Sequence, residues 1–127
     1  MATEFAQIRR FASRLRQARR HRFPPVGRGL SCPPQHGVYL IFDPAGRIAH
    51  VGRTTRTRAG LLDRLRAHLQ GRSSFVVSHL KGKREVLRRG YSYSWVEVND
   101  PRLRALVEAY ATGLFCPSHI GTGAALA

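Results

Sequence analysis

A chain of 127 residues, 43% of them hydrophobic, is long enough to fold as one domain with a modest core, which excludes a disordered polypeptide. No apolar run approaches the roughly 18 residues that a membrane-spanning helix needs, so no membrane partner is expected. Its 22 Lys and Arg residues face seven Asp and Glu, and this formal charge of +15 predicts a polyanionic partner, because self-repulsion alone would only destabilise the fold.

Residues 1–22 are expected to form a basic helical arm. Apolar residues recur there at helical spacing, at Phe5, Ile8, Ala12, Leu15 and Ala18. Arginines cover most of the remaining surface, and those that we expect to bind nucleic acid are Arg9, Arg10 and Arg16. The alternative, compatible with the first, is an ordinary amphipathic helix that packs on the domain with a solvated basic face. Residues 23–35, rich in proline and glycine, are expected to link this arm to a domain over residues 36–127.

A small sheet is expected at the start of that domain. The β-forming run from Gly37 leads into a type I turn over residues 43–46, and a second strand returns over residues 47–52. Strict alternation over residues 91–98 predicts a third strand, with its aromatic side chains on one face. We therefore expect a three-stranded, mostly antiparallel sheet.

Helices are expected to flank the sheet. A leucine stripe predicts a helix over residues 61–69, and serines predict the start of a short helix over residues 73–80. Asp100 followed by Pro101 is typical of a helix N-terminus, and Gly113 is placed to end that last helix. The fold class is therefore α/β, a small sheet flanked by helices, with a basic N-terminal helical arm.

Glu108 has the most informative setting of the seven acids. Hydrolysis of a phosphodiester needs an activated water, a cation aimed at the phosphate, and commonly a carboxylate that holds a divalent metal. On its predicted helix Glu108 points away from the apolar stripe, and its neighbours there include small residues that let other groups approach closely. A solvated glutamate on the outer face of a helix is the alternative.

Two further pairs of residues suit a phosphate site. Arg64 and His68 are four residues apart and lie on one face of the predicted helix, at the edge of its leucine stripe, although a solvent-facing basic helix has the same pattern. Tyr39 and His50 lie on the two strands of the predicted hairpin, flanked by glycines that permit close approach. From spacing alone, a core tyrosine and a structural histidine are the expected interpretation of this second pair.

In this order the residues resemble the GIY-YIG nuclease family, over roughly residues 36–120. Gly37-Val38-Tyr39 resembles the first tripeptide of the family, and His50-Val51-Gly52 stands where the second belongs. Neither tripeptide is specific alone, because such short sequences occur often by chance. The ordered combination with the later helices is much more specific.

The later elements carry the rest of the resemblance. Arg64, followed by His68, is similar to the helical arginine of the family, and Glu108 is similar to its metal-binding glutamate. Pro117 stands where the family often carries a proline, but Ser118-His119 replaces the common asparagine. His119 is therefore an accessory candidate in place of that asparagine.

The resemblance implies a metal-dependent DNA endonuclease that hydrolyses phosphodiester bonds with one Mg²⁺ or Mn²⁺ ion and no small-molecule cofactor. Glu108 would hold the metal, Arg64 would stabilise the charged transition state, and Tyr39 would act as, or position, the general base. Because His50 replaces the tyrosine of the second tripeptide, the alternative is that the base role has shifted to His50. A catalytically inactive nucleic-acid-binding module of the same fold is the second interpretation, and an RNA-associated structural protein is the third.

DNA is the expected partner, bound through guanidinium groups that match phosphate geometry. Beyond the arm, the arginines expected to bind it are Arg53, Arg56, Arg58, Arg66 and Arg72. One site cuts one strand, so double-strand breaks would need a homodimer on DNA or sequential nicking. Cys32 and Cys116 lack the spacing of a zinc site, and the N-terminus lacks a secretory leader, so a cytoplasmic protein is expected.

Overall fold

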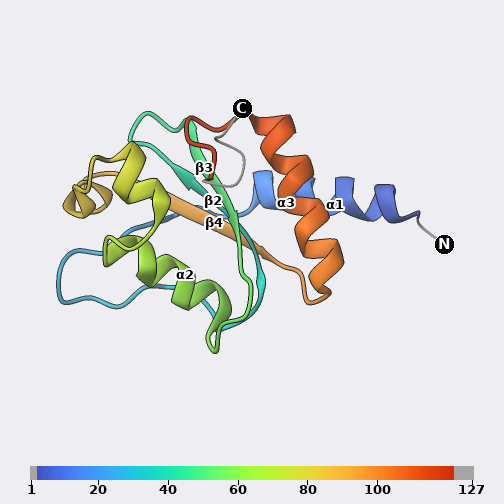
Figure 1. The fold of residues 1–127 in the computed structure, drawn as a ribbon, viewed down its shortest axis with the longest axis horizontal. Coiled ribbons are helices and arrows are strands. Elements are labelled where there is room, and N and C mark those ends of the chain that lie inside the picture. Colours follow the sequence, from blue (N-terminus) through green and yellow to red (C-terminus); the bar gives the residue numbers. More distant parts are fainter. Residues whose placement is uncertain (1–2, 122–127) are drawn as a thin grey trace.

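A computed structural model describes residues 3–121, so residues 1–2 and 122–127, which belong to the expected arm and domain, lie outside it. Its elements in chain order are α1 (Glu4–Gln17), β1 (His21–Arg22), β2 (Gly37–Phe42), β3 (Ile48–Arg53), α2 (Gly60–Leu69), the π-helical turn η1 (Phe75–His79), the 3₁₀ turn η2 (Arg84–Arg88), β4 (Ser92–Glu97) and α3 (Pro101–Phe115) (Figure 1). The expected α/β class is confirmed. None of the described helices is long and apolar enough to cross a lipid bilayer.

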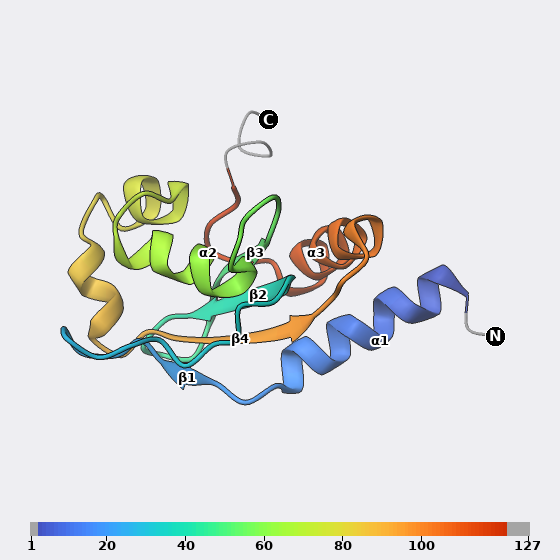
Figure 2. The same cartoon turned by 90° about the horizontal axis from the view of Figure 1, so that it is seen from below.

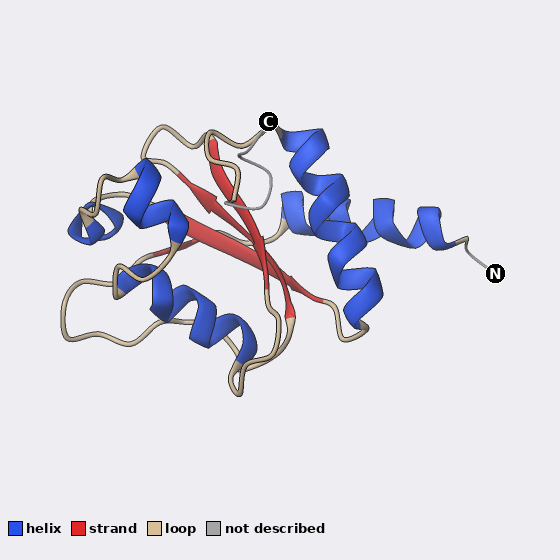
Figure 3. Ribbon diagram, in the orientation of Figure 1, coloured by secondary structure: helices blue, strands red, loops and turns tan. Residues whose placement is uncertain are grey.

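Four strands form one antiparallel sheet in the order β1-β4-β2-β3 (Figure 3). The expectation of three strands is wrong, because β1 adds a short edge strand in which His21 pairs with Tyr93 and Arg22 with Ser92. Two residues are too few for an alternation of apolar and polar side chains, so no sequence pattern indicates this strand. The β2–β3 hairpin forms as expected, and the Asp43 carboxylate accepts hydrogen bonds from two backbone N–H groups of its turn.

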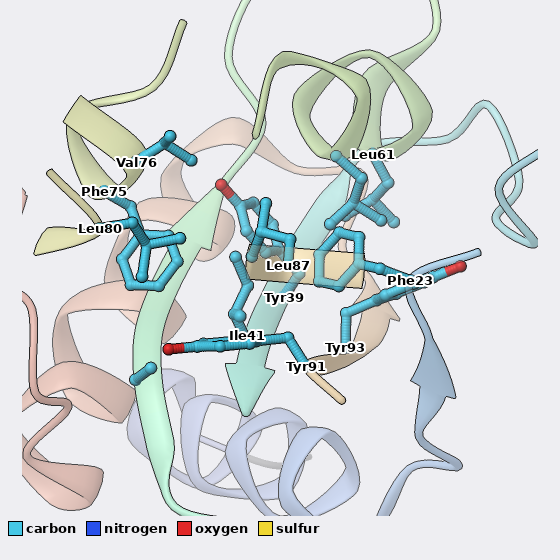
Figure 4. Packing of buried hydrophobic residues seen from close by; sticks show 12 residues of the cluster. Phe23, Tyr39, Ile41, Leu61, Phe75, Val76, Leu80, Leu87, Tyr91 and Tyr93 are labelled. Atoms are coloured by element: carbon cyan, nitrogen blue, oxygen red, sulfur yellow. The ribbon is translucent and has the colours of Figure 1, made fainter. Parts of the chain in front are cut away.

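The sheet separates two hydrophobic layers. Alternate residues of β2 point to opposite faces, so Val38 and Leu40 contact α1 and α3 whereas Tyr39 and Ile41 contact α2, η1 and η2. Figure 2 shows α2 on one side of the sheet and α1 on the other. Figure 4 shows the second layer, in which residues of α2 and η1 pack over the side chains of β2 and β4.

The first helix is docked on the domain with its arginines exposed. Ile8, Ala12 and Leu15 are buried, and they pack towards α3 and the sheet. The helix ends at Gln17, before the expected limit at residue 22, because the chain turns extended at Ala18 to reach β1. The described residues therefore adopt the second arrangement considered above, an amphipathic helix that packs on the domain with a solvated basic face.

The last helix begins as expected and ends later than expected. Asp100 accepts a hydrogen bond of 2.8 Å from the backbone N–H of Leu103, and Pro101 occupies the first turn. The expectation that Gly113 ends α3 is wrong. The helix continues to Phe115, which packs against the α1–α3 layer, and Cys116 ends it in the left-handed conformation at φ 48°.

Candidate active site

A cleft of about 600 Å³ opens where the β2–β3 hairpin meets α2 and α3. Side chains from both strands, from both helices and from the segment after α3 line it. The six side chains that the sequence singles out all lie in this cleft: Tyr39, His50, Arg64, His68, Glu108 and His119. The fold thus brings together residues that are up to 80 positions apart in the chain.

Tyr39 is fully buried, and its hydroxyl is held at the wall of the cleft. The Tyr39 oxygen and the Nε2 atom of His68 share a hydrogen bond of 2.7 Å. Tyr39 pairs with Gly52 across the hairpin, and a Cβ at position 52 would overlap the ring and the oxygen of Tyr39. The sequence predicts that the glycines of the hairpin permit close approach of another group. At Gly52 that group is the side chain of Tyr39, which needs the space that a Cβ would fill.

His68 continues this contact into a chain of hydrogen bonds. Its Nδ1 atom lies 2.7 Å from the Ser73 oxygen, which also accepts from the backbone N–H of Val76 at 3.2 Å. Burial, and then the charges of His50, Arg64 and His119, hold the pKa of His68 well below its usual value. A neutral imidazole has one donor and one acceptor nitrogen, so this ring can exchange a proton between Tyr39 and Ser73 by changing tautomer.

Charges around Tyr39 act in opposite directions. Burial raises the pKa of Tyr39 to about 12, and the charge and hydrogen bond of Arg64 partly oppose that rise. Glu108 raises the same pKa through its negative charge. At neutral pH the hydroxyl therefore keeps its proton, and the guanidinium lies where it would stabilise an anion.

Glu108 shares the cleft with two guanidinium groups. Its carboxylate oxygen Oε1 lies 3.5 Å from the Nε atom of Arg53, and both side chains are about one third exposed, at 30% and 35%. Burial raises the pKa of Glu108, while the charges of Arg53 and Arg64 oppose the rise. The carboxylate thus places oxygen atoms, which can act as ligands of a hard cation, in an arginine-rich cleft.

His50 lies on β3, where it pairs with Ile41 of β2. It has no hydrogen bond to His68 like that of Tyr39. Its ring stacks on Phe75 at 5.2 Å and meets His119 edge-on at 5.3 Å. Burial first, and then the charges of His119, Arg64 and His79, lower the pKa of His50 to about 3. In the part of the chain that the structure describes, four buried side-chain polar atoms lack a partner, and three of them are His50 Nδ1 and the two ring nitrogens of His119. Nitrogens of this kind are suited to water or to oxygen atoms of a ligand in the cleft.

The segment after α3 carries His119 into the site. Backbone N–H groups of Ser118 and His119 donate to the carbonyls of Ile48 and Ala49, at 3.2 and 2.8 Å. This segment therefore lies along the outer edge of β3, which is the edge strand of the sheet on this side. Burial, followed by the charge of His79, lowers the pKa of His119.

Glu108 is the carboxylate among the residues that line the cleft. Within residues 3–121, no group of three or more His, Cys, Asp or Glu side chains is arranged to share a metal ion. Mg²⁺ keeps several waters and binds through one or two carboxylates together with phosphate oxygens, so Glu108 has the chemistry to contribute one ligand to such an ion.

The arginines expected on nucleic acid are divided among several surfaces. Arg53 lines the cleft, Arg56 lines a neighbouring pocket, and Arg58 is exposed in the same loop. Arg72 is exposed and bonds to Gln70, and Arg66 lines a separate hollow on α2. The arm residues Arg9, Arg10 and Arg16 are exposed on α1, across the sheet from α2.

Sequence reasoning missed two features of the site. The sequence indicates Ser73 only as one of two candidate helix caps, and its hydrogen bond to His68 depends on the turn that follows α2. The pairing of Arg53 with Glu108 joins β3 to α3, and no spacing within either element indicates it.

No protein family model matches the chain, and no curated protein matches it.

Proposed function

We propose that this chain is a metal-dependent endonuclease that hydrolyses phosphodiester bonds of DNA, with a site of the GIY-YIG kind. One observation carries the proposal: the Tyr39 hydroxyl lies 2.7 Å from a buried, neutral His68 in the same cleft as Arg64 and Glu108. A titratable pair, a guanidinium and a carboxylate are the groups that phosphodiester hydrolysis needs.

Tyr39 acts as the first proton acceptor through His68. With a pKa of about 12, the phenol accepts a proton from the attacking water only if it passes its own proton to Nε2 of His68. The water oxygen then forms the new bond to phosphorus, the bond to the departing strand breaks, and the departing oxygen takes a proton from water in the open cleft. The hydroxide left by that water takes up the proton that His68 returns through Tyr39, which restores the neutral pair. The negative charge of a bound phosphate raises the proton affinity of His68 at that moment, which offsets the effect of the neighbouring cations.

Arg64, together with a metal ion that Glu108 would hold, stabilises the negative charge on the phosphate. Arg64 donates to the non-bridging phosphate oxygens as charge develops on them. Glu108 would hold Mg²⁺ or Mn²⁺, which would supply a further positive charge beside the phosphate. Arg53 lies close enough to Glu108 to keep the carboxylate charged before substrate arrives.

A nicking experiment tests the proposal. The purified protein is incubated with supercoiled plasmid and with branched DNA, in Mg²⁺, in Mn²⁺ or in EDTA. Metal-dependent nicking is expected, and Glu108→Gln should lower it by about 100-fold or more while Glu85→Gln, an exposed glutamate on η2, leaves it unchanged.

Two other results would replace the proposal. Binding of DNA without cleavage in any metal would indicate the inactive nucleic-acid-binding module, with the His50 and His119 positions as the cause. Preferential binding of folded RNA without DNA cleavage would indicate an RNA-associated protein.

A further inference from the structure

A second pocket of about 510 Å³ lies beside the cleft, between the loop that follows β3 and the start of α3. Arg53 and Thr55 line both cavities. The two cavities therefore form one path along the surface, on which a single extended ligand can occupy both.

The lining of this pocket is cationic and polar. Three arginines contribute, Arg53, Arg56 and Arg104, together with the polar side chains of Thr54 and Asn99. None of the described residues that line it is an aspartate or a glutamate. Guanidinium and hydroxyl groups without a competing carboxylate are the groups that bind phosphate oxygens.

Arg104 is the least expected member of this lining. It is 6% exposed, and its guanidinium donates to the backbone carbonyls of Thr54, at 3.0 Å, of Val98, at 3.0 Å, and of Asn99, at 3.4 Å. No carboxylate of residues 3–121 forms an ion pair with it, although the charge of Asp100 at the helix N-terminus favours its charged form. The carbonyls satisfy N–H groups but carry no full charge, so an anion in the pocket would supply a charge partner that they do not.

We propose that this pocket binds the backbone phosphate of the nucleotide next to the scissile one. The assignment of which phosphate is cut rests on the proposed function, whereas the binding of a backbone phosphate does not. Arg56 contacts that phosphate from the loop, Arg104 from beneath, and Arg53 lies between the two sites. The substrate strand thus enters the cleft through an arginine-lined path that fixes its direction.

The first test measures how salt weakens DNA binding in EDTA, where no cleavage occurs. Arg56→Gln and Arg28→Gln remove the same charge from exposed loop positions, and only Arg56 lines the pocket. Each phosphate contact contributes about 0.9 to the slope of log affinity against log salt, so Arg56→Gln should reduce the slope by about that amount and affinity by about 5-fold. Arg28→Gln should change the slope by less than about 0.3. Equal effects of the two substitutions would overturn the proposal.

The second test locates the phosphate. A DNA substrate carries one uncharged methylphosphonate linkage, placed beside the cleaved one and bound in EDTA. This linkage should weaken binding of the wild type and of Arg28→Gln about 5-fold, and that of Arg56→Gln less than about 2-fold, because the interacting pair is already broken. If the uncharged linkage weakened binding of Arg56→Gln as much as that of the wild type, the placement of this phosphate in the pocket would be wrong.

The two proposals fail separately. A protein that never cuts DNA but gives the expected difference in salt dependence retains the phosphate pocket and loses the endonuclease. A protein that cuts DNA with identical slopes for Arg56→Gln and Arg28→Gln loses the pocket alone.

Discussion

Tyr39 and His50 differ in what their surroundings allow them to do. Tyr39 has a partner that can take its proton, and Arg64 lies where it stabilises the resulting anion. His50 has a pKa of about 3, and its Nδ1 atom has no partner among the described residues. Burial lowers the pKa of His68 as well, so proton affinity alone does not distinguish the two candidates. The difference is that the Tyr39 hydroxyl already shares a hydrogen bond with His68 beside Arg64, an arrangement along which a proton can move. Tyr39 is therefore the better candidate for the base, acting with His68.

Tyr39→Phe should separate the two roles. Removing the hydroxyl should lower kcat by about 100-fold or more, the usual contribution of a general base, while the Kd for DNA changes by less than about 3-fold. His50→Ala should lower kcat by less than about 10-fold. Single-turnover cleavage measures both variants, with urea unfolding as the control for folding. The reverse order of the two losses would place the base at His50.

The buried histidines should make the fold sensitive to mild acid. In the unfolded chain His50 and His68 bind a proton near pH 6.5, whereas in the folded chain the pKa of each lies far lower. The free energy of unfolding is therefore highest above pH 6.5 and falls as the pH drops, by about 1.4 kcal/mol per pH unit for each such histidine. Urea unfolding at pH 7.5, 6 and 5 measures this loss. His68→Gln should remove about one proton from the pH dependence, and a stability that does not change between pH 7.5 and 5 would contradict the assignment.

At the scale of elements, the sequence predicts what local patterns determine. A β-forming run and a turn predict β2 and β3, alternation predicts β4, a leucine stripe predicts α2, and the Asp100–Pro101 pair predicts the start of α3. It does not predict β1, which pairs with β4 across some 70 residues, or the contact of Ser118 and His119 with β3. These pairings depend on tertiary packing. The shared location of Tyr39, Arg64, His68 and Glu108 was expected only through the resemblance, because periodicity does not tell how a hairpin and two helices are placed in space.

Gly113, at which the sequence predicts the end of the last helix, lies inside α3 and gives a stability prediction. The glycine lies within α3, is exposed, and has nothing within 4 Å of an added Cβ. Alanine has a higher helix propensity, so Gly113→Ala should raise the free energy of unfolding by about 0.5–1 kcal/mol. Thermal and urea unfolding measure the change, with Gly29→Ala outside the described helices as a matched control in open space. A loss of stability would mean that this turn of α3 is not helical in solution.

At the scale of the whole molecule, the positive charge is spread over two sides of the sheet. Arg53, Arg56 and Arg58 lie in and near the cleft, whereas the arginines of α1 lie across the sheet from α2 (Figure 2). At 0.1 M salt, charges interact over about 10 Å, so exposed arginines on the α1 side contribute little to a short duplex held in the cleft. A long DNA that continues around the molecule would contact both sides. The two sets of arginines should therefore respond differently to the length of the DNA.

Two matched triple variants test this division of charge. Arg53, Arg56 and Arg58 are replaced by Gln in one variant, and Arg9, Arg10 and Arg16 in the other, so each loses three positive charges. For a 12-base-pair duplex in EDTA, the first variant should lose about 2 from the slope of log affinity against log salt, and the second less than about 0.5. For DNA of plasmid length both variants should bind more weakly than the wild type, because contacts on the α1 side then contribute. Equal losses on the short duplex would mean that α1 itself contacts the bound duplex, which would place the nucleic acid across the edge of the sheet instead of within the cleft alone.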